Sequence, residues 1–347
     1  MIKIDGITRK WGDFVISDVS LEIKDGEYFV VLGPTGAGKT LLLELLAGFY
    51  GPEKGNIYKD DKDISDQPPQ ERGFGFVYQD YMLFPHLDVK GNIAYGLRVN
   101  EKSDINRKVK DIAEKVGVSE LLSRVPSTLS GGEKQRVSIA RAMALEPDVL
   151  LLDEPFGSVD DQTGKKLRSL MKELHKKVGC TIIQVTHDQE EAVVQGDRIA
   201  VMKDGAIQQV GTPENIMRKP RSKFVAEFVG TGNIFHGTAK KEKDVSMVDV
   251  GNVDIVSSYT LEGDVTLTIR PEDIILAEEP FESSARNNFK GRVKEINDRG
   301  IYHEIIVDVG VPLIVYVTRQ SIDNLELKKG KEIWTVFKAS TVHLFKE

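Results

Sequence analysis

The sequence feature that most constrains the fold is GPTGAGKT, at residues 33–40. It matches G-x-x-x-x-G-K-[ST], a loop whose backbone N–H groups surround phosphates at a helix N-terminus. The motif requires a buried strand before it and a helix after it, and the runs YFVVL and LLLELLA stand in those places. A glycine-rich turn matching by chance is therefore disfavoured. The residues expected at the phosphates are Gly33, Pro34, Thr35, Gly36, Ala37, Gly38, Lys39 and Thr40.

Two members of this loop have more specific expected roles. Lys39 would reach the β and γ phosphates of ATP, and the Thr40 hydroxyl would hold Mg²⁺. The run VLLLDEP, at residues 149–155, supplies two carboxylates at the end of a second apolar strand. Asp153 would hold the Mg²⁺ shell, and Glu154 would accept a proton from the attacking water. A helix-capping carboxylate is the alternative for one acid, but it explains the pair less well.

The order of predicted elements indicates two domains. Up to about residue 212, apolar strand-like runs alternate with helical ones, which is typical of an α/β domain with a mostly parallel sheet. Residues 80–145 are mainly helical and predict a helical insertion in that domain. Later segments such as VTLTIR and PLIVYVT are short and alternating, which predicts a small antiparallel barrel. We therefore expect an ATPase domain at residues 1–229 and an all-β domain at residues 230–347.

Composition excludes several function classes. The 347 residues, 40% of them hydrophobic, suffice for two cores, and the one cysteine, Cys180, is expected to be a reduced core thiol. The apolar runs are much shorter than the roughly 20 residues of a membrane span, so a membrane role would require a partner. The N-terminal stretch has no apolar export signal. The net charge of −7 is spread along the chain, which argues against nucleic-acid binding.

The stretch LSGGEKQR, at residues 129–136, resembles the signature of ATP-binding-cassette (ABC) ATPases, and the resemblance covers residues 1 to about 230. Ser130, Gly131 and Gly132 open a helix, so their hydroxyl and N–H groups would form a second phosphate cradle. One phosphate group is not easily gripped by both cradles of one chain. The resemblance implies a head-to-tail homodimer in which ATP lies between the loop of one copy and the signature of the other.

The same resemblance implies further site residues. Gln79, in FVYQD, corresponds to the Q-loop and would contact Mg²⁺ and the reacting water. Ser158–Asp160 corresponds to the D-loop, with Asp160 at the nucleotide. His187 corresponds to the switch histidine, and Trp11 to the aromatic residue that stacks on adenine. Two departures from the family pattern are Leu41, in place of a hydroxyl at the α phosphate, and Val159, in place of leucine.

Other segments resemble importers within this family. YMLFPHLDVKGNIAYGL is similar to the Q-loop continuation of bacterial and archaeal importers, and PENIMRKP and TIRPEDI are similar to segments of their sugar, polyamine and oxyanion subclasses. This resemblance implies a peripheral subunit on the cytoplasmic face of the cell membrane. Its partners would be transmembrane permease subunits and, indirectly, an extracellular substrate-binding protein.

The stretch SSARNNFKGRV, at residues 283–293, resembles small molybdate-binding proteins and the matching tail of molybdate importer ATPases. The similarity continues through VTRQSIDNLELKKGKEIWTVFKASTVHL. Molybdate and tungstate carry no protons at neutral pH, so their site needs only donors and cations. The residues expected at the oxyanion are Ser284, Ala285, Arg286, Asn287, Thr318, Ser321, Lys338 and Ser340.

Three interpretations remain open from the sequence. The first is a molybdate or tungstate importer ATPase whose tail binds the oxyanion and inhibits transport by feedback. The second is an importer ATPase for sugar, polyamine or another solute, with a structural tail. The third is an oxyanion storage or regulatory protein, which the complete set of catalytic residues disfavours.

Overall fold

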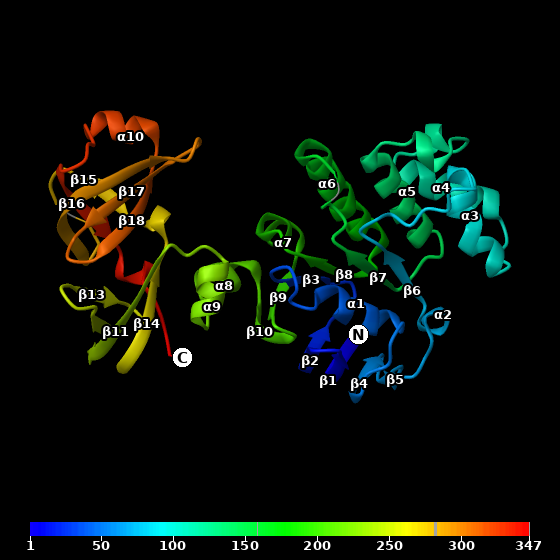
Figure 1. The fold of residues 1–347 in the computed structure, drawn as a ribbon, viewed down its shortest axis with the longest axis horizontal. Coiled ribbons are helices and arrows are strands. Elements are labelled where there is room, and N and C mark those ends of the chain that lie inside the picture. Colours follow the sequence, from blue (N-terminus) through cyan, green and yellow to red (C-terminus); the bar gives the residue numbers. More distant parts are fainter. Residues whose placement is uncertain (158, 281–282, 347) are drawn as a thin grey trace. The chain divides into compact units, whose positions relative to one another are not determined.

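The computed structural model describes residues 1–157, 159–280 and 283–346. The chain divides into two compact units, Met1–Pro213 and Glu214–Glu347 (Figure 1). The boundary expected at residues 229–230 follows two short helices, α8 (Pro213–Arg218) and α9 (Lys223–Phe228), which the structure groups almost entirely with the second unit.

The first unit contains two sheets. The six-stranded sheet has the order β10-β9-β3-β8-β7-β6 and is parallel except for the β10–β9 pair. Its strands are β3 (Tyr28–Leu32), β6 (Phe74–Val77), β7 (Val149–Asp153), β8 (Thr181–Thr186), β9 (Arg198–Lys203) and β10 (Ala206–Gly211). The four-stranded sheet is antiparallel with the order β2-β1-β4-β5. Its strands are β1 (Ile2–Trp11), β2 (Phe14–Ile23), β4 (Lys54–Lys59) and β5 (Lys62–Asp63).

Burial follows the apolar pattern of these strands. Every residue of β3, β7 and β8 is buried, as expected for apolar strands covered on both faces. The antiparallel sheet, which the sequence pattern did not predict, contributes side chains such as Ile4 and Ile16 to the same core. The predicted mostly parallel sheet is confirmed, and this second sheet packs its apolar face onto the same core.

Within the described residues, the first unit has seven α-helices that lie wholly inside it. They are α1 (Lys39–Ala47), α2 (Pro69–Arg72), α3 (Val89–Val99), α4 (Ile105–Lys115), α5 (Gly131–Met143), α6 (Asp161–Val178) and α7 (Gln189–Gln195). Helices α3, α4 and α5 lie together between β6 and β7 in chain order, and α3 packs against both of the others (Figure 1). They form the expected helical insertion.

The second unit contains two five-stranded antiparallel sheets, as the alternating segments predicted. One has the order β13-β12-β11-β14-β20 and the other β15-β19-β16-β17-β18. The first comprises β11 (Asn233–Glu242), β12 (Val245–Asp249), β13 (Asp254–Ser257), β14 (Gly263–Ile269) and β20 (His343–Phe345). The second comprises β15 (Ile275–Ala277), β16 (Asn287–Asp298), β17 (His303–Asp308), β18 (Pro312–Val317) and β19 (Glu332–Phe337), and α10 (Arg319–Asn324) follows β18.

Both sheets of the second unit share one apolar core. Leu267 of the first sheet and Ile305 of the second are fully buried in the same cluster of side chains. These curled sheets have the architecture of an OB-like barrel domain. Along the described part of the chain, no helix combines the length and the apolar character that crossing a membrane requires.

Candidate active site

The phosphate loop lies between the carboxyl end of β3 and the start of α1. Lys39 is the first residue of α1 and its side chain is only 5% exposed. Its Nζ donates hydrogen bonds to the backbone oxygens of Gly33 (2.9 Å) and Pro34 (3.0 Å), so the ammonium lies inside the curled loop. Burial lowers the pKa of Lys39, and the nearby carboxylates of Glu154 and Asp153 oppose that shift. An anion entering the loop would exchange these carbonyl contacts for a full charge pair.

At one position of the loop, both the backbone conformation and the lack of room for a side chain require glycine. Gly38 has φ +95°, and a Cβ atom there would lie 2.6 Å from the ring of Phe14. Phe14 begins β2, so a strand of the antiparallel sheet supports the loop from the side. The close approach keeps the backbone N–H groups at the start of α1 accessible to a phosphate.

A hydroxyl and a carboxylate lie side by side next to the loop. Asp153 ends β7, and its Oδ1 accepts a hydrogen bond of 3.0 Å from Thr40 Oγ1. Burial raises the pKa of Asp153, while the hydrogen bond from Thr40 lowers it. Gln79, just beyond the end of β6, lines a cavity that Thr40 also lines. Mg²⁺ prefers oxygen ligands of these kinds, so the side chains present fit that ion.

Glu154 has a strained backbone, and its carboxylate lies between the His187 imidazole and the Lys39 ammonium group. Its φ is +41°, a conformation that costs a non-glycine residue about 1–3 kcal/mol. A hydrogen bond of 3.0 Å from its N–H to the Val185 carbonyl holds it there. Glu154 Oε1 lies 3.1 Å from His187 Nδ1 and 3.9 Å from Lys39 Nζ. The carboxylate is thereby directed toward the phosphate loop.

These side chains surround one cavity of about 640 Å³. Its lining residues come from the start of β2, the phosphate loop, the start of α1 and the positions just beyond β6, β7 and β8. They are Phe14, Thr35, Gly36, Gly38, Lys39, Thr40, Leu41, Gln79, Glu154 and His187. The structure thus brings together most of the residues that the sequence predicted for the phosphates, the metal ion and the reacting water.

The signature residues lie at the start of α5 and are not among those lining this cavity. Ser130 caps the helix, and its hydroxyl and N–H both donate to Glu133 Oε2, at 2.9 Å and 2.8 Å. Gly131 and Gly132 form the first turn. A Cβ atom on Gly132 would lie 2.4 Å from Thr163 Cγ2, so this glycine lets α5 approach α6 closely. Within one chain, the two predicted phosphate cradles remain separate.

The expected D-loop is described in part. Asp160 caps α6 by accepting a hydrogen bond of 3.0 Å from Thr163 N, and this contact lowers the pKa of the exposed carboxyl group. Ser158 lies outside the described residues. Asp160, Glu154 and His187 line a second cavity of about 250 Å³.

The aromatic residue beside the nucleotide cavity is Phe14 rather than Trp11. Trp11 makes an edge contact with Tyr50 at 5.5 Å between ring centroids, and the Arg9 guanidinium lies 5.2 Å from its ring. Stacking of Trp11 on adenine stays a prediction. Phe14 pairs with Trp11 across the β1–β2 hairpin, which is the signal that would have drawn attention to it.

The predicted oxyanion residues fall into two groups within the second unit. Ser284, Ala285 and Arg286 directly precede β16, which begins at Asn287, and Asn287 pairs with Phe337, just before Lys338 and Ser340. Thr318 and Ser321 begin α10, where their hydroxyl oxygens are 3.0 Å apart. Thr318 follows the end of β18, which pairs through β17 with the opposite end of β16. One tail therefore does not bring the two groups together.

Asn287 has a structural partner. It is 1% exposed, its Oδ1 accepts from Val256 N (2.8 Å), and its Nδ2 donates to Val256 O (2.9 Å). These bonds fasten β13 to β16. Side chains of the same group that are exposed, and so accessible to a ligand, belong to Ser284, Arg286, Lys338 and Ser340.

This fold and this cavity define a P-loop ATPase of the ATP-binding-cassette class. Residues 16–157 match the family model described as ABC transporter, and residues 283–344 match the TOBE domain. The molybdate/tungstate import ATP-binding protein of Pyrococcus horikoshii is 41% identical over 348 residues, covering 99% of this chain and 100% of that protein. The chain belongs to the family of ATP-binding subunits of ABC importers with a C-terminal TOBE domain.

Two further comparisons bear on cargo and assembly. The sulfate/thiosulfate import ATP-binding protein of Agrobacterium fabrum is 40% identical over 97% of this chain and 99% of that protein. A solved dimeric ATP-binding cassette in a post-hydrolysis state, bound to ADP and Pi, is 30% identical with a TM-score of 0.55. It covers 61% of this chain and 99% of the solved one.

Proposed function

We propose that this chain powers the import of molybdate or tungstate and that its tail binds the transported oxyanion. The observation that carries the proposal is the similarity to a molybdate/tungstate import protein along the full length of both chains, tail included. The donors in the tail support it, because a tetrahedral dianion without protons needs only N–H groups, hydroxyls and cations.

The cavity geometry supports specific roles in ATP hydrolysis. The loop and Lys39 hold the phosphates, while Thr40, Asp153 and Gln79 hold Mg²⁺, which neutralises charge on the phosphate oxygens when bound. Glu154 accepts the proton of the attacking water, and His187 fixes the direction of that carboxylate.

The separation of the two phosphate cradles supports a homodimer with shared sites. Ser130, Gly131 and Gly132 of one copy would complete the cavity of the other, with Asp160 close by. The Ser130 hydroxyl, which here donates to Glu133, would turn toward the γ phosphate. We further propose that the dimer binds transmembrane permease subunits from the cytoplasmic face of the membrane. The permease subunits would receive cargo from an extracellular binding protein.

The separation of the two oxyanion groups supports a site made by two tails. Arg286 and Lys338 at one end of β16 would meet Thr318 and Ser321 of a second copy. Such a site exists only while the tails are paired, so bound oxyanion would favour one arrangement of the dimer. The tail then acts as a feedback inhibitor of import.

Sulfate is a second candidate cargo, and one comparison supports it. The relative that imports sulfate and thiosulfate is 40% identical over nearly the whole chain. Sulfate is also a tetrahedral dianion, so the same donors would suit it in charge and shape. A sugar or polyamine importer would use the tail as structure alone.

Calorimetry of the full chain distinguishes these cargoes. The chain is titrated with molybdate, tungstate, sulfate, phosphate and spermidine. Saturable heat with molybdate or tungstate alone, lost in Lys338→Ala and retained in the exposed Lys329→Ala control, is the expected result. Saturable heat with sulfate alone would transfer the proposal to sulfate. No heat with any anion would leave the tail without an oxyanion role.

A further inference from the structure

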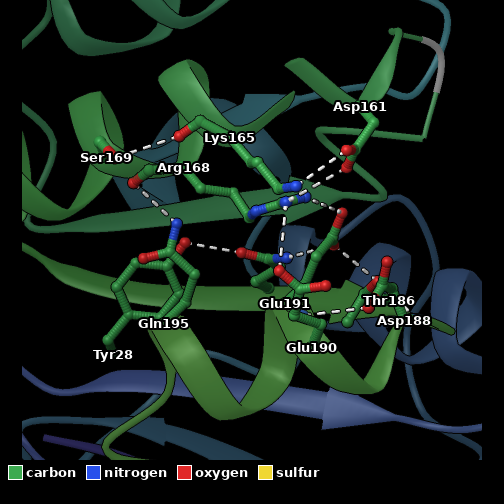
Figure 2. A network of polar contacts seen from close by, with 11 residues as sticks. Tyr28, Asp161, Lys165, Arg168, Ser169, Thr186, Asp188, Glu190, Glu191 and Gln195 are labelled. Carbon is green, nitrogen blue, oxygen red and sulfur yellow. Dashed lines mark hydrogen bonds and ion pairs between the residues drawn. The ribbon is translucent and has the colours of Figure 1, made fainter. Parts of the chain in front are cut away.

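A buried carboxylate contacts Thr186, and Thr186 and Asp188 are the two chain neighbours of His187 (Figure 2). It belongs to Glu191 in the first turn of α7, and its side chain is only 5% exposed. Its Oε2 accepts hydrogen bonds from Thr186 Oγ1 (2.8 Å) and Gln184 Nε2 (3.2 Å). Glu191 thus holds the residue that directly precedes His187.

The residue that follows His187 is tied to the same place. Asp188 N donates to Thr186 Oγ1 at 3.0 Å, and Asp188 Oδ1 accepts from Glu191 N at 3.1 Å. Both neighbours of His187 are therefore fixed to Glu191, while the His187 imidazole itself faces Glu154 at 3.1 Å. The direction of the imidazole depends on this arrangement.

Arg168 connects Glu191 to α6. Its Nη1 lies 3.6 Å from Glu191 Oε1, and its side chain is 9% exposed. Gln195 Nε2 donates to the Arg168 carbonyl at 2.8 Å, which is a second buried link between α6 and α7 (Figure 2). Arg168 Nη2 also lies 3.9 Å from Asp161, the first residue of α6. The Arg168–Glu191 ion pair therefore joins the segment that carries His187 to α6, the helix that begins at the expected D-loop.

The same groups surround one space. The cavity of about 250 Å³ beside Glu154 is lined by His187, Asp160, Arg168 and Glu191 among others. A shift of the start of α6 would therefore change the shape of the cavity that His187 also lines.

Packing alone does not account for this ion pair. Removing two charges from water is costly, and an apolar pair of similar volume is often as stable. Burial raises the pKa of Glu191, while the Thr186 hydrogen bond and the Arg168 charge favour the ionised form. What the ion pair provides beyond an apolar pair is direction, because each oxygen of the carboxylate has a defined partner.

We propose that Glu191, held by Arg168, is a positioning residue for ATP hydrolysis that fixes His187 against Glu154 and couples it to the start of α6. The inference rests on the roles proposed above for His187 and Glu154. Glu191 and Arg168 act through His187 and touch neither the nucleotide nor the reacting water.

The test uses variants of the full chain that change charge but little volume. Glu191→Gln is expected to lower kcat for ATP hydrolysis about 10- to 100-fold, with KM and the ATP affinity measured without Mg²⁺ unchanged. Arg168→Met should lower kcat similarly, and Arg168→Lys should restore most of it. Glu190→Gln is the matched control, since Glu190 lies 3.7 Å from Arg168 but is 64% exposed, and such pairs contribute little.

Combination with a His187 variant shows whether Glu191 acts through that residue. In a His187→Ala background, Glu191→Gln should cause no further loss, because residues that act as a unit are not additive. If the double variant loses kcat by the product of the two single losses, the inference is overturned. A normal kcat in Glu191→Gln, when His187→Ala is slow, would also overturn it. If Glu191→Gln does not fold, Thr186→Val removes the hydroxyl that donates to Glu191. A normal kcat in both Thr186→Val and Arg168→Met would then overturn the inference. Normal turnover in His187→Ala alone would instead refute the role proposed for His187 and, with it, this inference.

Discussion

At the scale of single residues, the site depends on how a few charged groups are directed. Glu154 is held in a left-handed backbone conformation, with His187 at 3.1 Å and Lys39 at 3.9 Å from its carboxylate. Strain of this kind persists only where surrounding contacts over-determine it, and here the bond to Val185 is one of those contacts. Direction of the carboxylate is therefore built into the fold before nucleotide binds.

Glu154→Gln tests this residue-scale account. The amide keeps the size of the side chain but cannot accept a proton, so ATP should bind normally while turnover falls about 10²- to 10⁴-fold. Steady-state hydrolysis and nucleotide binding by the purified full chain measure the two effects separately. Glu120→Gln, at an exposed position outside the cavity, is the control. Near-normal hydrolysis by the Glu154 variant would remove Glu154 from the role of base.

At the scale of elements, local pattern predicted much of the catalytic domain. The apolar runs that precede the polar motif residues became β3, β7 and β8, because a strand buried on both faces leaves a continuous apolar signal. The motifs also placed the phosphate loop just after β3 and Glu154 just after β7, at the carboxyl ends of strands in one parallel sheet, and Lys39 at the start of the helix that follows the loop. Both parts of the prediction rest on local information.

Long-range partners could not be predicted in the same way. Arg72 is 2% exposed and donates to the carbonyls of Leu45 and Leu46 at the end of α1, although an arginine in a short polar helix looks like a surface residue. Phe14 at the phosphate loop and the Arg168–Glu191 pair are of the same kind. Which buried polar groups meet depends on tertiary packing, and a one-dimensional period does not encode it.

The two helix N-termini, of α1 and α5, give the element-scale prediction. If each site combines α1 of one copy with α5 of another, Lys39→Ala and Ser130→Arg chains should complement each other on mixing. A mixed dimer has one site with both lesions and one with neither, so activity should recover in part. ATPase assays of mixtures measure this, with each single variant as control. Activity that never exceeds the sum of the separate variants, despite heterodimers detected by native mass spectrometry, would contradict shared sites.

At the scale of the whole molecule, the proposed function joins an ATP-hydrolysing unit to a tail that would respond to cargo. A ligand that binds only one state stabilises it by about 2.7 kcal/mol at 100 times its dissociation constant. That shifts a two-state equilibrium roughly a hundredfold, enough to hold the two ATPase units of a dimer apart when ATP favours closure only modestly. Inhibition therefore requires that the oxyanion distinguish the two states, as a site formed by two tails would.

The most direct test of the central claim is the ATPase rate of the complete transporter in vesicles, titrated with molybdate or tungstate on the side of the ATPase subunits. If the tail inhibits import by feedback, the inhibition should be saturable and absent with sulfate at equal concentration. The Lys338→Ala variant should retain its basal rate and lose the inhibition, while Lys329→Ala should behave like the unmodified chain. A rate of the unmodified transporter that stays constant up to millimolar molybdate and tungstate would contradict the account.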